Sequence, residues 1–106
     1  MAGALTELTT ATFDDVVKAG GTLVDFWAPW CPPCRAQARL LEAAATKLAG
    51  RAAVAKVNTD EQGDLAARFS VMNIPTLLLL KDGKEMRRLT GLQQTDELVA
   101  AVEALL

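Results

Sequence analysis

The fold of this chain is decided by the stretch Thr22-Leu23-Val24-Asp25-Phe26-Trp27-Ala28-Pro29-Trp30-Cys31-Pro32-Pro33-Cys34. Residues 22–28 are nearly all apolar and rich in β-forming types, which predicts a strand covered on both faces, as in a parallel sheet. Pro29 ends this strand. Pro32 and Pro33 cannot lie inside a helix but fit its first turn, so we expect a helix that continues over residues 35–48.

Before this stretch, the sequence predicts a short strand and a helix. The strand covers residues 4–7. The helix begins at Thr12, whose hydroxyl can cap it, while Asp15 reaches back to complete a capping box. Gly20 and Gly21 end the helix, because glycine adopts the backbone conformation that closes one.

After this stretch, the pattern predicts three further strands and two further helices. We expect strands over residues 52–58, 76–81 and 85–90, a helix over residues 60–69, and a last helix capped by Thr95. Asp82-Gly83 lies between the last two strands and predicts a type I′ hairpin, because glycine accepts the positive φ that this turn requires. Three charged side chains place the final strand at a sheet edge: Glu85, Arg87 and Arg88.

The order of these elements defines an α/β fold. The first three strands are each followed by a helix and are expected to be parallel, whereas the final hairpin adds an antiparallel strand. Helices then cover both faces of the sheet. A chain of 106 residues has the length of one domain, so we expect a single domain over residues 1–106.

The composition excludes several classes of function. The 11 basic and 13 acidic residues give a net charge of −2, which offers no electrostatic attraction for nucleic acid or an acidic membrane surface. The longest apolar run, residues 77–80, is far below the roughly 20 residues that cross a bilayer. Histidine is absent, which excludes Cys-His catalysis. The sequence also lacks the glycine-rich loop that would predict a bound nucleotide cofactor.

The first residues of the chain also bear on location. They lack a basic start followed by an apolar stretch, so we expect no signal peptide and a cytoplasmic protein. A chain from which a leader had been removed would have the same sequence pattern.

The two cysteines form a Cys-x-x-Cys motif where a buried strand meets a helix, which is the setting of a redox motif. Cys31 precedes the helix and Cys34 lies in its first turn, so the sulfurs can meet without moving the backbone, and the helix dipole favours the Cys31 thiolate. Two alternatives compete with this interpretation. A structural disulfide would close a loop too short to stabilise the fold much. A zinc site would need ligands from a second chain, because zinc takes four.

Asp25 is the only charged residue in the predicted central strand. Because its neighbours on both sides are apolar, we expect a buried carboxyl group with a raised pKa, suited to accept a proton. The alternative is a solvated charge on an irregular strand.

Three groups of residues together resemble the thioredoxin family. They are the segment from Asp25 to Arg35, the tripeptide Ile74-Pro75-Thr76, and Lys81-Asp82-Gly83-Lys84 followed by Gly91. They occur in the family's order and at its spacing over the whole chain. The resemblance implies a thioredoxin fold, in which a central mixed five-stranded sheet is flanked by four helices.

The resemblance also implies catalytic roles. Cys31 would be the attacking thiolate, and Cys34 the thiol that resolves the mixed disulfide. Asp25 would exchange a proton with Cys34 through water, with Lys56 beside it, although a solvated strand-end lysine is an alternative for Lys56. Pro75 would follow a cis peptide bond and lie against the cysteines.

A docking surface for substrates is implied as well. It would comprise Trp30, Ile74 and Gly91, and the Ile74 backbone would pair with an extended substrate segment. We expect Trp30 to be exposed at the site. Trp27 is instead expected in the core or just behind the site.

Three positions depart from the usual family pattern. Pro32 stands beside Pro33 where glycine usually precedes the proline, which removes an N–H that could bond the Cys31 thiolate and stiffens the loop. Arg39 replaces a proline that commonly bends the long helix, so we expect a straighter helix. Asn73 replaces a glycine before Ile74, where its side chain would narrow or polarise the docking groove.

We therefore expect a protein-disulfide reductase of the thioredoxin type. It would work as a monomer, with no metal and no cofactor beyond the redox-active Cys31–Cys34 pair. Its partners would be disulfide-containing proteins and a separate thioredoxin reductase as electron donor, with neither nucleic acid nor membrane. One alternative is a disulfide oxidant or isomerase, which would stabilise its thiolate more strongly. Another is a non-catalytic protein-binding subunit, which would keep its function without either cysteine.

Overall fold

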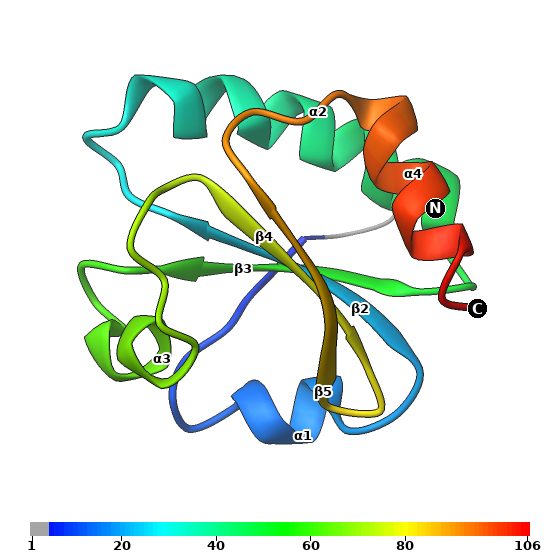
Figure 1. Ribbon diagram of the computed structural model, residues 1–106, viewed down its shortest axis with the longest axis horizontal. Helices are drawn as coiled ribbons and strands as arrows, with labels where there is room; N and C mark the ends of the chain where they lie inside the picture. The colour runs from blue at the N-terminus through cyan, green and yellow to red at the C-terminus, as the bar shows by residue number, and fades with distance from the viewer. Residues whose placement is uncertain (1–4) are drawn as a thin grey trace.

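A computed structural model describes residues 5–106, and its central feature is one five-stranded sheet (Figure 1). The strands are β1 (Thr6–Glu7), β2 (Gly21–Trp27), β3 (Ala53–Asn58), β4 (Thr76–Lys81) and β5 (Lys84–Thr90). The helices are α1 (Phe13–Val17), α2 (Pro32–Leu48), α3 (Gly63–Arg68) and α4 (Thr95–Glu103). The prediction of an α/β fold with a mixed sheet and four helices is confirmed.

The strand that leads to the cysteines lies at the centre of the sheet, whose order is β1-β3-β2-β4-β5. β1, β3 and β2 are parallel, as predicted. β4 runs antiparallel to β2, and β5 runs antiparallel to β4. The position between β3 and β4 explains why β2 is so apolar, since both of its edges are paired and both of its faces are covered.

Helices cover both faces of the sheet: α2 and α4 lie on one side, and α1 and α3 on the other (Figure 1). Because side chains alternate along a strand, the strands β2, β3 and β4 each contribute to two cores. Leu23 and Leu79 lie in the core beneath α2 and α4. Val24, Phe26 and Leu78 lie in the core that α1 and α3 cover. Residues of β2 with odd numbers therefore face the helix that carries the cysteines.

The hairpin between β4 and β5 matches the sequence prediction. Asp82 has φ +51° and Gly83 has φ +82°, and positive φ at both central residues defines a type I′ turn. β4 covers residues 76–81 as expected, and β5 is an edge strand, as its charged residues indicated.

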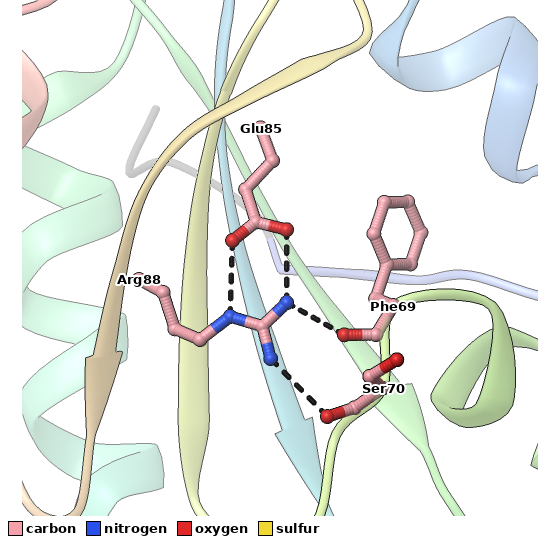
Figure 2. A network of polar contacts seen from close by, with 4 residues as sticks. All are labelled: Phe69, Ser70, Glu85 and Arg88. Atoms are coloured by element: carbon pink, nitrogen blue, oxygen red, sulfur yellow. Dashed lines mark hydrogen bonds and ion pairs between the residues drawn. The ribbon is translucent and has the colours of Figure 1, made fainter.

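One of the charged residues on β5 also holds the end of α3 in place (Figure 2). The Arg88 guanidinium donates to the Phe69 carbonyl at 2.6 Å and to the Ser70 carbonyl at 3.3 Å. Glu85 accepts from the same guanidinium at 2.9 and 3.0 Å, which keeps it oriented. Ser70 has φ +52°, a left-handed conformation that few residues other than glycine adopt. Arg88 thus anchors the start of the segment that leads to Ile74.

Thr12 is the N-cap residue of the first helix, as predicted, but its predicted capping bond is wrong. Thr12 makes no side-chain capping bond to α1. Its hydroxyl instead accepts the Thr9 N–H at 3.0 Å, within the turn that precedes the helix. The capping box with Asp15 therefore does not form.

The predicted cap of the last helix is also wrong. Thr95 is the first residue of α4, and the N-cap is Gln94, whose N–H donates to the Glu97 carboxylate at 3.0 Å. The Thr95 hydroxyl donates to the Leu40 carbonyl of α2 at 2.9 Å. The Thr95 side chain, which the local sequence predicted to cap α4, therefore makes a tertiary contact with α2 instead.

Several element boundaries differ from the sequence prediction. β2, β3 and β5 are shifted by one residue at one or both ends, and α1 ends at Val17, before the predicted stop at Gly20 and Gly21. Two elements differ by more. The first strand was expected over residues 4–7; it covers Thr6–Glu7, and residue 4 lies outside the described residues. The helix expected over residues 60–69 covers Gly63–Arg68. It starts late because the Glu61 and Gln62 N–H groups donate to the Asn58 carbonyl, which forms a turn after β3.

Candidate active site

The two cysteines meet at the N-terminus of α2. Cys31 takes the N-cap position with an extended backbone, φ −97° and ψ 108°. Pro32 and Pro33 fill the first two helical positions, where an N–H would have no partner within the helix. Cys34 follows in the first turn, and the two cysteines form a disulfide with a Cα–Cα distance of 5.2 Å.

In the part of the chain that the structure describes, one backbone N–H donates to the Cys31 sulfur. It belongs to Cys34, at 3.2 Å. Pro32 and Pro33 have no N–H to offer, and the Arg35 N–H donates to the Cys31 carbonyl. The site can therefore stabilise a Cys31 thiolate through this hydrogen bond and the helix dipole.

The Ile74–Pro75 peptide and Gly91 complete the surroundings of the disulfide. The peptide bond is cis, as the family resemblance implied. Ile74 packs against the cluster formed by Ala28, Cys31 and Cys34, and its carbonyl oxygen lies 3.9 Å from Cys31 Sγ. The Gly91 N–H donates to the Pro75 carbonyl at 2.8 Å. The cis-proline segment therefore lies against the sulfur pair, and the Gly91 segment is bonded to the cis-proline segment.

Exposed apolar side chains belong to the same three segments. Trp30 is 65% exposed, and its indole N–H donates to the Asp60 carboxylate at 3.0 Å. Met72, two residues before Ile74, is 88% exposed, and Leu92, next to Gly91, is 45% exposed. The expectation of an exposed Trp30 is confirmed, and Met72 and Leu92 are exposed apolar side chains on the other two segments.

Two of the unusual positions lie before the cis-proline and within α2. Asn73 is exposed, and its carbonyl accepts the Thr76 hydroxyl, so its backbone helps to shape the turn before Pro75. α2 continues unbroken through Arg39. That this helix is straighter than its relatives stays a prediction.

Asp25 lies in the middle of β2 and is 1% exposed. By strand alternation its side chain lies on the same face as Leu23, beneath α2. Within residues 5–106, its Oδ1 atom has no hydrogen-bond partner. Burial raises the pKa of Asp25 to about 7, while the charge of Lys56 lowers it and the charge of Glu7 raises it. The carboxyl group is therefore buried, as predicted, and can exchange a proton near neutral pH.

Lys56 lies opposite Asp25 in the register of β2 and β3. Its ammonium group pairs with the Glu7 carboxylate at 3.8 Å and lies 4.9 Å from the centre of the Trp27 ring. The Trp27 indole N–H donates to the other Glu7 oxygen at 3.1 Å. The Lys56 ammonium group thus interacts with Glu7 and Trp27 as well as with Asp25. Its positive charge therefore balances the charge of an ionised Asp25 only in part.

This arrangement predicts that Glu7→Gln lowers the pKa of Asp25 below about 7, because a negative charge that raises it is removed and Lys56 loses its competing partner. We expect a decrease of a fraction of a pH unit, since Glu7 is partly exposed. A pH titration of the Asp25 carboxyl resonance in the oxidised protein measures it. Glu61→Gln removes an exposed carboxylate elsewhere and serves as the control. An unchanged or raised pKa in Glu7→Gln would contradict the prediction.

Sequence reasoning missed three polar residues of the site: Glu7, Asp60 and Gln37. Glu7 and Asp60 carry no local signal, because sheet register and chain folding bring them to their indole partners. Gln37 had a signal, since it lies one turn after Cys34 on the apolar stripe of α2. A polar residue in such a stripe indicates a buried hydrogen bond.

Among residues 5–106, no helix is long and apolar enough to span a membrane. These residues also form no group of three or more metal-ligating side chains. The disulfide and the buried Asp25 carboxyl are the candidates for redox and proton-transfer chemistry.

A cysteine pair at the N-terminus of a helix, after a central strand and facing a cis-proline, defines the class of thiol–disulfide oxidoreductases. Comparisons with known proteins agree. Residues 4–104 match the Thioredoxin family model. A thioredoxin from Staphylococcus saprophyticus is 41% identical over 100 residues, covering 94% of this chain and 96% of that protein. Thioredoxin from Staphylococcus aureus is 40% identical with the same coverage.

The solved structures give the same result. A mutant thioredoxin from Halobacterium salinarum superposes with a TM-score of 0.89 at 33% identity, covering 97% of this chain and 91% of that one. The chain belongs to the thioredoxin family. It is a thiol–disulfide oxidoreductase that reduces protein disulfides.

Proposed function

We propose that Cys31 is the attacking thiolate of this reductase and Cys34 the resolving thiol. The observation that carries this assignment is the position of the Cys31 sulfur at the N-terminus of α2, where the Cys34 N–H donates to it at 3.2 Å. The hydrogen bond and the helix dipole favour negative charge on that sulfur. Cys34 lies inside the helix, where its sulfur reaches Cys31 without backbone movement.

The reaction then proceeds by two thiol–disulfide exchanges. The Cys31 thiolate attacks one sulfur of the substrate disulfide, forms a mixed disulfide and releases the first substrate thiolate. Cys34 loses its proton and attacks the Cys31 sulfur. The Cys31–Cys34 disulfide forms and the second substrate thiolate leaves. The substrate has gained two electrons, and the protein has lost two.

Asp25 is the group we assign to accept the proton of Cys34. A pKa of about 7 lets it take up and return a proton at neutral pH. Lys56 tunes this pKa from the neighbouring strand. Pro32 and Pro33 begin the helix that carries Cys34, and Pro75 shapes the turn before β4.

The docking surface we assign to substrates comprises Trp30, Ile74 and Gly91. The Ile74 backbone faces Cys31, so an extended segment of the partner would place its disulfide against the attacking sulfur. Met72 and Leu92, exposed neighbours of Ile74 and Gly91 in the sequence, add further apolar side chains to this assignment.

We further propose that the whole chain acts as one monomeric domain, with the Cys31–Cys34 pair as its only redox group. Electrons would come from a thioredoxin reductase, because each turnover leaves the protein oxidised. A reductant of protein disulfides belongs in a compartment where thiols are kept reduced, such as the cytoplasm.

The equilibrium potential of the Cys31–Cys34 pair tests the direction of the reaction. One N–H donor on the Cys31 sulfur stabilises the thiolate only moderately. We therefore expect a reduction potential of roughly −270 mV, which is typical of thioredoxins. Equilibration against a dithiol buffer, followed by tryptophan fluorescence, measures it. A value of about −180 mV or higher would instead assign the protein to the isomerases and oxidants. A Cys31→Ser/Cys34→Ser variant that kept full function in cells would favour the non-catalytic binding role.

A further inference from the structure

Gln37 is a fully buried amide on the face of α2 that points into the protein. Its exposed fraction is 0%, and it lies one turn after Cys34 on the same face. Within α2, the other buried side chains are cysteine, leucine and alanine. An amide in such surroundings is retained only if its hydrogen bonds are made, because an unpaired buried polar group costs about 1–3 kcal/mol.

The partner of Gln37 is the backbone of Gln93, 56 residues later. The Gln37 Oε1 atom accepts the Gln93 N–H at 2.8 Å, and its Nε2 atom donates to the Gln93 carbonyl at 3.0 Å. The side chain therefore pairs with both backbone groups of one residue, as a neighbouring strand would. The segment between β5 and α4 has no regular structure of its own, so this pairing fixes a backbone that no ladder holds.

The fixed segment contains Gly91 and Leu92, and Gly91 is bonded to the cis-proline that follows Ile74. The Gly91 N–H donates to the Pro75 carbonyl at 2.8 Å, and the neighbouring Ile74 carbonyl lies 3.9 Å from Cys31 Sγ. A closed ring of contacts results. It runs from Cys31 through Cys34 and one turn of α2 to Gln37, then through Gln93 and Gly91 to the cis-proline and back.

We propose that Gln37 is a positioning residue for substrate docking, which holds the Gly91–Gln93 segment against the helix that carries the cysteines. This inference rests on the proposed docking role of Gly91 and its neighbours. Gln37 touches neither sulfur, so its loss should weaken the binding of folded protein substrates and leave the exchange chemistry intact. Its amide is an element of specificity for protein disulfides over small ones.

Gln37→Leu tests the proposal, because leucine fills the space and leaves both backbone groups of Gln93 without a partner. With insulin as the protein disulfide, we expect the KM of the Gln37→Leu variant to rise about tenfold while kcat stays unchanged. A tenfold change corresponds to the loss of about one good hydrogen bond. The rate with a small aromatic disulfide should stay within about twofold of wild type, and the Cys31–Cys34 potential should not change. An unchanged KM for insulin would overturn the proposal, as would an equal loss with both disulfides.

Gln37→Glu provides a test within one folded protein. The protonated carboxyl can donate to the Gln93 carbonyl and accept the Gln93 N–H, whereas the carboxylate can only accept. Burial raises the pKa of such a group, so KM for insulin relative to wild type should be near one at about pH 5.5 and rise towards pH 8.5. A ratio that stays flat over this range would also overturn the proposal.

Thr95→Val is the matched control, because it removes another hydrogen bond onto α2, from Thr95 Oγ1 to the Leu40 carbonyl, two residues beyond Gln93. It should lower the stability of the fold without raising KM. If KM rises as much in this variant, general loosening explains the effect and the proposal is wrong. Failure of the proposed docking surface would look different, since Trp30→Ala would then leave KM for insulin unchanged as well.

Discussion

Replacing Cys31 with serine should abolish disulfide reduction, with a loss of at least about a thousandfold, whereas Cys34→Ser should stop the reaction halfway. In Cys31→Ser no thiolate is left at the helix N-terminus to attack the substrate. In Cys34→Ser the attack takes place, but nothing releases the product. A covalent complex with one substrate molecule should accumulate on a non-reducing gel and disappear on addition of dithiothreitol.

The difference between the two variants distinguishes the role of each cysteine from the effect of losing the disulfide. Both remove the Cys31–Cys34 disulfide, so an effect of the lost cross-link would be the same in both. Accumulation of the complex in Cys31→Ser and not in Cys34→Ser would reverse the two roles. Equal activity in wild type and both variants would exclude the dithiol mechanism altogether.

Asp25→Asn should stabilise the fold above neutral pH, and this is the largest stability change that we expect. The pKa of Asp25 is raised from 3.8 to about 7 by burial. Between these values the folded protein keeps the proton and the unfolded chain releases it, so stability falls as pH rises through this window. The shift corresponds to about 4 kcal/mol of the free energy of unfolding. The protein has lost all of this contribution above about pH 7 and none of it below about pH 4.

Denaturant unfolding of the oxidised protein as a function of pH measures this effect. The wild type should lose stability between about pH 4 and 7 relative to Asp25→Asn, and the two curves should converge at low pH. Glu61→Gln, which neutralises an exposed carboxylate, should run parallel to the wild type. A constant difference between wild type and Asp25→Asn at every pH would contradict a buried, titrating Asp25.

The same substitution should remove the inflection near pH 7 from the resolving step. Asparagine cannot accept the Cys34 proton, so release of the mixed disulfide should be slower at neutral pH and should recover only when solvent hydroxide takes over. Single-turnover kinetics over pH 5–9 distinguish attack from release. An unchanged pH profile of release would remove the proton-transfer role while leaving the stability effect in place.

Local sequence determined the features that depend on a few adjacent residues. The strand over residues 76–81 and the turn at Asp82-Gly83 follow from apolar run length and from the φ that glycine tolerates. The disulfide follows from Cys-x-x-Cys at a strand-to-helix junction, where the backbone already brings the sulfurs together. The burial of Asp25 follows from the uniformly apolar strand around it.

Only the tertiary structure decided which distant groups meet. No local pattern shows that β4 runs antiparallel to β2 at the centre of the sheet. Nor does any local pattern show that the Thr95 hydroxyl bonds the Leu40 carbonyl of α2 instead of capping α4. The ion pair of Lys56 with Glu7 depends on the register of three strands, and the pairing of Gln37 with Gln93 joins groups 56 residues apart. The physical reason is the same in each case. Propensity and turn chemistry act over a few residues, whereas the partner of a buried polar group is set by the packing of the whole sheet and its helices.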